Sequence, residues 1–508
     1  MLVKAVADQL PKYNDYLLRG FQKKELAQAP QFVGTILEEA VKLLGPQIQY
    51  KDYKILSPEE RLDIETARGY NIAPSELILV EYRFEFNKTI YKTRFYLPYD
   101  FNGYIVIRGT KLSLQKHIAE QIFSRTSEGI TVKVIRATLI FRRGRRHLMI
   151  SETSDFTKYE FVITTTLYQK RVSGRKNSVL PTVLHYMLCK FGLVHTLERF
   201  GLTQADLHFT NTVSEDTDKY EYFAAKKTLK KKKPELYMKI RKELLDDPIC
   251  SKLAAGLLYI LAASNRHSLE DLYERTGAIF RILLGYIIRG GNEAQAKNQV
   301  DAHLASVDLY LDPITRDRLR NHGITVSNIY DLLQYIFVEI DRIIVNSTQS
   351  NLYNKRIDVT DSILVATIGN AIHRKFWEIS RQNKGLDENT VKAALRFNPM
   401  LIDKLIMEKV VKSNPPLYGD NWLLAAGIRK LRQSGKKSSG GEGMVANAPE
   451  HRVHPSHFVV ESALAFSKQN PGIAGSINPY VPISPDGVII VPDYAQDIDN
   501  LSPYLPFQ

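Results

Sequence analysis

Three histidines at intervals of three residues are the first candidates for chemistry in this sequence. His451, His454 and His457 lie in the stretch EHRVHPSHFVV, with Pro455 between the second and the third. Imidazoles bind zinc, but a structural zinc site needs a fourth ligand. The proline also disfavours a helix that would place all three on one side. We therefore expect no metal here and interpret His454 and His457 as residues that hold a turn. A metal-dependent hydrolase is the alternative.

A basic, glycine-rich loop precedes these histidines. Residues 429–443 read RKLRQSGKKSSGGEG. A phosphate-binding loop of the Walker type requires a lysine and a hydroxyl after its glycines, and SGGEG has neither. The cations of the loop suit contacts with a nucleic-acid backbone, and a solvated flexible loop is the alternative. The candidate contacts are Arg429, Lys430, Arg432, Lys436 and Lys437.

Two more basic clusters occur earlier in the chain. The expected strand VKVIRATLIF runs into a cluster of arginines, which it would hold in fixed positions against phosphates. These arginines are Arg142, Arg143, Arg145 and Arg146. Residues 226–233, KKTLKKKK, contain six lysines, and we interpret them as a solvated surface segment.

Composition limits the class of protein. The net charge of +14 favours a polyanionic partner such as nucleic acid. With 44% apolar and 24% charged residues, the chain has the composition of a soluble globular protein. Cys189 and Cys250 are the only cysteines, which excludes a disulfide framework and a cysteine zinc site and favours a reducing compartment. No apolar run reaches the roughly 18 residues of a membrane span, and the N-terminus lacks the apolar core of a signal peptide.

The residue pattern indicates a mixed α+β fold with several domains. The first 70 residues have helical periodicity. From Glu76 the period changes to two, and ELILVEYRFEF, TIYKTRFYLPY and YIVIRG predict a small antiparallel sheet. From about 236 to 290, and again at 329–345, the pattern is helical. No repeat of fixed period occurs, which argues against a solenoid.

Several passages along the chain are similar to sequences of one known protein family. NGYIVIRGTKLSLQKHIAEQIF at 102–123 is similar to that family's "FIINGTERVIVSQL", and LYNKRIDVTDSILVATIGNAIHRKF at 352–376 is similar to "LGNKRIRLVGELLQNQFR". KSNPPL at 412–417 resembles "DQTNPL", and GSINPYV at 475–481 resembles "GLINSLA". With these passages the chain resembles β subunits of multisubunit DNA-directed RNA polymerases.

The stretch SGGEG…EHRVHPSH at 439–457 resembles the fork loop of the same family, where "GPGGL" precedes "RDVHPTHYG". Gly440, Gly441, Arg452, Val453, His454, Pro455 and His457 take those places. The resemblance implies that Arg452 faces nucleic acid, and that the glycines, Pro455 and the two histidines build the fork.

Differences between this sequence and the family's sequences narrow the resemblance to one kind of β subunit. ESALAFSKQNPG replaces the family's "CPIETPEG", and the β half that carries "HGNKG" is not in this sequence. The pattern resembles the N-terminal half of the split β subunits encoded by large (jumbo) bacteriophages. By analogy, residues 1–140 and 351–410 would form the protrusion, 141–350 the lobe and 411–508 the fork with a docking tail.

The resemblance implies a subunit without catalytic residues that forms one wall of the DNA and hybrid cleft. It would bind no cofactor, since Mg²⁺ belongs to a β′-like chain. Expected partners are the C-terminal half of β, β′-like chains, template DNA and nascent RNA, with or without a separate promoter-specificity subunit. No membrane is expected. The expected location is the cytoplasm of the infected bacterial host, or the virion. The alternative is a nucleic-acid-binding phage structural or accessory protein without a polymerase role.

Overall fold

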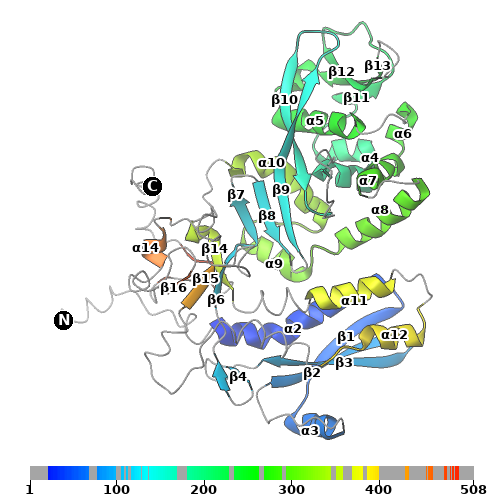
Figure 1. Ribbon diagram of the computed structural model, residues 1–508. Helices are drawn as coiled ribbons and strands as arrows, with labels where there is room; N and C mark the ends of the chain where they lie inside the picture. Colours follow the sequence, from blue (N-terminus) through cyan, green and yellow to red (C-terminus); the bar gives the residue numbers. More distant parts are fainter. Residues whose placement is uncertain are drawn as a thin grey trace, which may run out of the picture.

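The structure, a computed structural model, describes most of the chain (Figure 1). Helices and largely antiparallel sheets build it, which confirms the predicted α+β class. The described residues are 21–67, 77–98, 105–107, 110–112, 116–126, 129–134, 137–168, 180–227, 234–262, 268–288, 293–344, 351–358, 369–380, 386–399, 430–433, 454, 456–460, 474–476, 481, 483–484 and 487–490.

The first sheet is built on the hairpin that the alternating pattern predicted. β2 (Leu77–Phe86) and β3 (Thr89–Pro98) are antiparallel along their whole length. Between them Asn87 and Lys88 have φ angles of 49° and 61°. Positive φ at both residues of a two-residue turn matches the right-handed twist of the flanking strands.

Helix α2 (Phe21–Val41) packs closely on the inner face of this sheet. Gly34 allows the approach, because a Cβ at that position would lie 2.7 Å from the Tyr50 hydroxyl. The Tyr82 hydroxyl, which is buried, donates a hydrogen bond to the Pro30 carbonyl at 3.0 Å. Helix and sheet are therefore joined by a polar contact inside the apolar layer.

The smaller of two large hydrophobic cores lies between α2 and the sheet. It also takes in apolar residues from 352–395 and 460–489, so distant parts of the chain share it. In Figure 1, α2, α11 and α12 lie over one face of the sheet, and α3 lies at its far end. The remaining elements here are η2 (Lys42–Leu44), β1 (Ile48–Ile55), α3 (Pro58–Ala67), β4 (Ile105–Ile107), β5 (Thr110–Leu112), η4 (Leu352–Asn354), α11 (Asn370–Ser380) and α12 (Glu388–Leu395).

The larger core is made by residues between Ile122 and Ile340. It combines a four-stranded sheet in the order β10-β9-β8-β7, a three-stranded sheet in the order β11-β13-β12, and the helices around them. The strands are β7 (Phe123–Thr126), β8 (Gly129–Lys133), β9 (Thr138–Ile150), β10 (Thr157–Thr165), β11 (Leu207–Thr210), β12 (Tyr220–Lys227) and β13 (Pro234–Arg241). The helices are α4 (Val183–Arg199), η3 (Lys242–Leu244), α5 (Pro248–Ala262), α6 (Leu269–Tyr273), α7 (Ala278–Ile288), α8 (Glu293–Asp308), α9 (Pro313–Asn321) and α10 (Ile329–Ile344).

Helix α9 connects the two cores. Its Ile314 packs against the smaller core. The guanidinium carbon of Arg318 lies 5.5 Å from the centroid of the Phe32 ring on α2. A helix that belongs to the larger core by sequence thus reaches the first helix of the smaller one.

Four sequence-based expectations are wrong in detail. Residues 48–55, expected to be helical, form β1, because pairing with β2 overrides local periodicity. The single strand expected at 132–141 is divided between β8 and β9, where Val134 and Ala137 exchange backbone hydrogen bonds in a turn. Residues 236–241 belong to a strand and not to a helix. The strand expected at 104–109 pairs with β5 and does not extend the hairpin.

Candidate nucleic-acid interface

A mixed four-stranded sheet gathers segments that lie far apart in the sequence. β6 (Lys116–Glu120) pairs antiparallel with β14 (Lys355–Asp358) and parallel with β15 (Lys430–Gln433), and β16 (Ala474–Ser476) pairs with β15. Three of these strands lie in or overlap the passages that resemble polymerase β. β15 lies in the segment 429–443, which was expected to be a loop but forms a strand at 430–433, because it pairs with β6 and β16. Figure 1 shows the sheet beside the N-terminal end of α2, below the larger core.

Near its start, the passage at 352–376 has two cations that lie inside this sheet. Lys355 and Arg356, both in β14, are 2% and 5% exposed. The Ile357 N–H donates to the Gly487 carbonyl at 2.7 Å, and Arg356 forms an isolated bridge with Val488. These two cations therefore help to build the sheet and are not presented on the surface.

The histidine turn is hydrogen-bonded to η4, the short helix that directly precedes β14. Helix α14 (Ser456–Val460) begins at Ser456, whose N–H donates to His454 Nδ1 at 3.2 Å. The Leu352 N–H donates to Ser456 Oγ at 2.9 Å. His454 is 7% exposed and His457 is fully buried. Within the described part of the chain, no group of three His, Cys, Asp or Glu residues could hold a metal ion.

A cavity of about 260 Å³ lies between this sheet and α9. Arg318 and His322 line it from the side of the larger core, and Arg356 and Ser484 line it from the side of the sheet. Basic and polar groups from both cores thus meet at the place where the cores join.

The arginine cluster lies inside β9 and not at its end. Arg142 and Arg146 are exposed, and the guanidinium carbon of Arg146 lies 4.8 Å from the Phe161 ring centroid. Arg143 is different, because it forms an ion pair of 2.5 Å with Asp341. Backbone atoms place Arg145 in the same strand. Two residues of the cluster are therefore exposed cations, while Arg143 links the sheet to α10.

Asp341 also binds a second cation, Lys252, at 2.8 Å. Lys252 is 3% exposed and donates a further hydrogen bond to the Phe337 carbonyl at 2.8 Å. Burial alone would raise the pKa of Asp341, but the contacts with Lys252 and then Arg143 hold that pKa below its ordinary value. The carboxylate therefore stays charged and ties three elements of the larger core together.

A β-bulge at Gly144 bends the strand that carries the arginine cluster. The register between β9 and β10 shifts between Phe161 and Ile163. A Cβ at Gly144 would lie 2.5 Å from Thr164 Cγ2 and 2.9 Å from the Val162 carbonyl oxygen. A β-bulge bends the strand and re-aims the side chains on either side of it.

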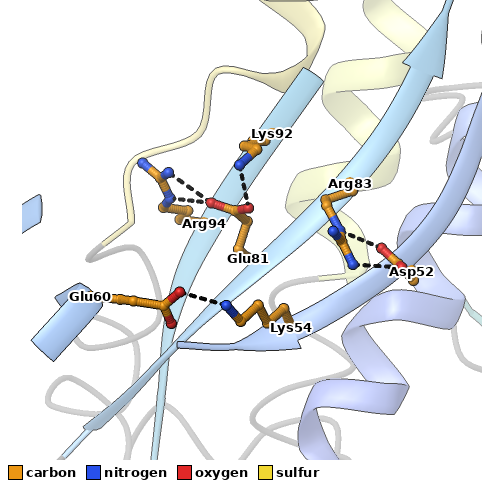
Figure 2. Close-up of polar contacts among 7 residues, drawn as sticks. All are labelled: Asp52, Lys54, Glu60, Glu81, Arg83, Lys92 and Arg94. Carbon is orange, nitrogen blue, oxygen red and sulfur yellow. Dashed lines mark hydrogen bonds and ion pairs between the residues drawn. The ribbon is translucent and has the colours of Figure 1, made fainter. Parts of the chain in front are cut away.

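The outer face of β1-β2-β3 is also rich in cations, but acids compensate them (Figure 2). Glu81, which is 4% exposed, binds both Lys92 at 2.9 Å and Arg94 at 2.7 Å. The other pairs on this face are Arg83 with Asp52, Lys54 with Glu60, and Lys51 with Glu85. Each of these cations has a carboxylate beside it, so the positive charge of this face is largely compensated.

Comparison with protein families decides what the chain is. Residues 10–490 match the family described as non-virion RNA polymerase subunit. The chain belongs to this family. It is therefore a subunit of an RNA polymerase, as the resemblance to β predicted, and part of a nucleotidyltransferase. No curated protein matches the sequence.

Only some of the residues predicted to contact nucleic acid lie in the described part of this polymerase subunit. Lys430 and Arg432 lie in β15, where Arg432 is opposite His117 of β6. The site role of all predicted residues stays a prediction. The predicted site residues that lie outside the described part of the chain are Arg429, Lys436, Lys437, Gly440, Gly441, Arg452 and Pro455.

The sequence did not predict the residues that bind Arg143 of the arginine cluster and hold it in place. Lys252 and Asp341 are separated from Arg143 by about one hundred and two hundred residues of chain. The one sequence feature that marks Lys252 and Asp341 is a charged residue within an apolar helical pattern, as in SKLAAGLLYILAA and VEIDRII.

Among the described helices of the polymerase subunit, none has the length and apolar character of a membrane span.

Proposed function

We propose that this RNA polymerase subunit is the N-terminal half of a split β subunit and forms one wall of the DNA and hybrid cleft. The observation that carries the proposal is the sheet β14-β6-β15-β16. Segments near residues 116, 355 and 474 were singled out by likeness to β, and they are neighbours in space. Chance likeness in unrelated segments gives no reason for them to pair in one sheet.

The two cores support the proposed division into protrusion, lobe and fork. Residues 122–340 form the larger core, which overlaps the proposed lobe at 141–350 but begins about twenty residues earlier, within the segment assigned to the protrusion. The smaller core unites residues 26–118 with 352–395, as a protrusion with a return segment at 351–410 requires. Residues 460–489 contribute to this same core, and the fork at 411–508 would thus be built against the protrusion.

Nucleic acid would contact the subunit through exposed cations in fixed strands. Arg142 and Arg146 on β9 are of this kind, and Lys430 and Arg432 would act with the basic loop that contains them. Such contacts neutralise phosphates and position the duplex without reading its sequence. Arg143 would act indirectly, by holding β9 on α10 through Asp341.

The chemistry of RNA synthesis would lie on other chains. In this proposal the chain supplies no catalytic residue and binds no cofactor, and Mg²⁺ is held by a β′-like chain. Its partners are the C-terminal half of β, β′-like chains, template DNA and nascent RNA, with or without a separate promoter-specificity subunit. The family description favours the cytoplasm of the infected bacterium over the virion. The same membership disfavours a structural phage protein without a polymerase role.

Reconstitution tests this function. The purified polymerase is assembled from its subunits with and without this chain and supplied with template DNA, nucleotides and Mg²⁺. The proposal expects RNA synthesis from the complete assembly, none from this chain alone, and loss of stable DNA binding when the chain is omitted. Full RNA synthesis without this chain would contradict it.

A further inference from the structure

Strand β9 has an edge that no described strand covers along its second half. β10 pairs with β9 from Phe141 to Ile150, but β8 pairs with it only as far as Arg142. Figure 1 shows β9 and β10 continuing as a two-stranded ribbon beyond the end of β8. The backbone of residues 143–150 can therefore accept another strand on this side.

The uncovered edge faces β12 across a groove. Ser151 and Phe223 form an antiparallel bridge, and the Glu152 N–H donates to the Tyr222 carbonyl at 2.8 Å. Beyond this bridge the two strands leave a cavity of about 320 Å³ between residues 147–150 and 223–225. Leu258, Leu261 and Ala262 of α5 line it as well, so its floor is apolar.

A buried carboxylate holds the closed end of the groove in place. Glu221 is 2% exposed and accepts hydrogen bonds from three hydroxyls of the turn after β9. They come from Ser151, from Thr153 at 3.0 Å and from Ser154 at 2.5 Å. This network ties the turn to β12, and the groove is therefore formed before any ligand enters it.

Exposed apolar side chains lie beside the groove. Leu148 and Ile150 are 36% and 49% exposed, and Tyr159, opposite Leu148 on β10, is 62% exposed. Edge strands in soluble proteins are normally protected by lysine, proline or a covering element. The sequence His-Leu-Met-Ile at 147–150 contains neither lysine nor proline. Such an edge is typical of a surface that a partner covers.

We propose that an extended segment of another polypeptide of the assembled polymerase adds a strand to the edge of β9 at residues 143–150, which no described strand covers. The segment has apolar residues at alternate positions, which contact the floor on α5, and acidic residues toward the open end. Backbone hydrogen bonds provide affinity in this mode of binding, and the alternate side chains provide specificity.

The charges around the groove favour a partner segment with acidic residues. At the open end the groove is flanked by Arg146, whose side chain is exposed. Among the described residues that line the groove, the acid is Glu152, which follows the bridge at the closed end. Acidic residues near the open end would therefore be attracted.

Two other occupants fit less well. A nucleic-acid strand has no alternating N–H and C=O groups to pair with a strand edge, and the leucine and alanine floor offers nothing to phosphates. A second copy of this chain that presented the same edge would bring the two arginine clusters together, which costs free energy through like-charge repulsion.

Photo-crosslinking within the assembled polymerase tests the proposal. A benzophenone amino acid is introduced in place of Leu148, and the adduct is identified by mass spectrometry. The control carries the same group in place of Val213, which is 40% exposed outside the groove. We expect an adduct with an acidic, alternating segment of another subunit from position 148 and not from position 213. Adducts with nucleic acid only, with a second copy only, or none at all would overturn the proposal.

Two further measurements separate binding from misfolding. Ala224→Glu places a large anion in the groove, which should repel the acidic segment and reduce the adduct yield roughly tenfold. In the unsubstituted protein, amide hydrogen exchange at residues 147–150 should slow on assembly, relative to the free full-length chain. Unchanged exchange or unchanged yield would contradict the proposal. RNA synthesis, measured in parallel, reports separately on the proposed function.

Discussion

The backbone N–H of Leu352 donates a hydrogen bond to Ser456 Oγ at 2.9 Å, although 104 residues of chain separate the two. Ser456 is 1% exposed, and its own N–H donates to His454. A buried polar group is costly unless it is hydrogen-bonded, so this pairing specifies how the histidine turn packs against η4, which leads into β14. The relationship joins two passages that resemble polymerase β.

Replacement of Ser456 by alanine should destabilise the protein. It would leave the buried Leu352 N–H without its acceptor, at a cost of about 1–3 kcal/mol. Urea unfolding followed by circular dichroism measures the change. Ser327→Ala, at an exposed position, is the matched control and should change stability by less than about 0.5 kcal/mol. Equal effects of the two substitutions would argue against the role of Ser456.

Asp341→Asn should destabilise the larger core. It removes the carboxylate from Lys252 and Arg143, and Lys252 is buried. Because the Asp341 side chain is 40% exposed, solvent weakens both pairs, and we expect a loss of about 1–3 kcal/mol. Asp317→Asn, in an exposed pair with Arg320, is the control and should have almost no effect.

The pH dependence of this variant gives a second readout. The contacts hold the pKa of Asp341 below its ordinary value, so its stabilisation is present above an unfolded pKa of about 3.9. That stabilisation is lost as the pH falls through the lower, folded pKa. The stability of Asp341→Asn should therefore decline less steeply than that of the unsubstituted protein below about pH 4. Parallel curves would contradict the ion-pair account.

His303 should make stability fall at mildly acidic pH. Burial lowers its pKa to about 4, so the folded state keeps it neutral while the unfolded state binds a proton below about pH 6.5. Stability should decline between these values by about 1.4 kcal/mol per pH unit from this group. His303→Phe should remove that part of the slope. Tyr186→Phe removes the hydrogen bond of 3.0 Å to His303 but keeps the histidine, and it should retain the slope.

The exposed arginines of β9 should contribute to binding of DNA by the assembled polymerase. Replacing Arg142 and Arg146 by glutamine should reduce the slope of log affinity against log salt concentration by about 0.9 for each phosphate that the protein no longer neutralises. Fluorescence anisotropy of labelled duplex DNA over a salt series measures the slope. Arg143→Gln is the contrast, since this substitution should lower stability and leave the slope nearly unchanged. An unaltered slope in the double variant would remove β9 from the interface.

Strong local patterns predicted the elements that they describe. The alternation from Ile78 to Phe86 and the short Asn-Lys turn predicted the hairpin β2-β3 correctly. The helical periodicity of 329–345 likewise predicted α10. By contrast, β1 was missed, because its strand conformation depends on pairing with β2 and not on its own sequence pattern.

The candidate site was predictable in its residue types but not in its geometry. The sequence indicated the arginines of β9, but it could not distinguish Arg143, whose partner Asp341 lies 198 residues further along the chain. The resemblance selected the passages around Lys355 and Ser476. Their pairing through β6 and β15 is a long-range arrangement that no local pattern carries.

Crosslinking from β15 in a transcribing complex tests the central claim most directly. A photoreactive amino acid replaces Arg432, and the assembled polymerase is halted on template DNA with a labelled nascent RNA. If this chain forms a wall of the cleft, irradiation should join position 432 to the DNA or the RNA, and the same group in place of Val213 should give no nucleic-acid adduct. Adducts with protein alone, from a complex that is making RNA, would contradict the claim.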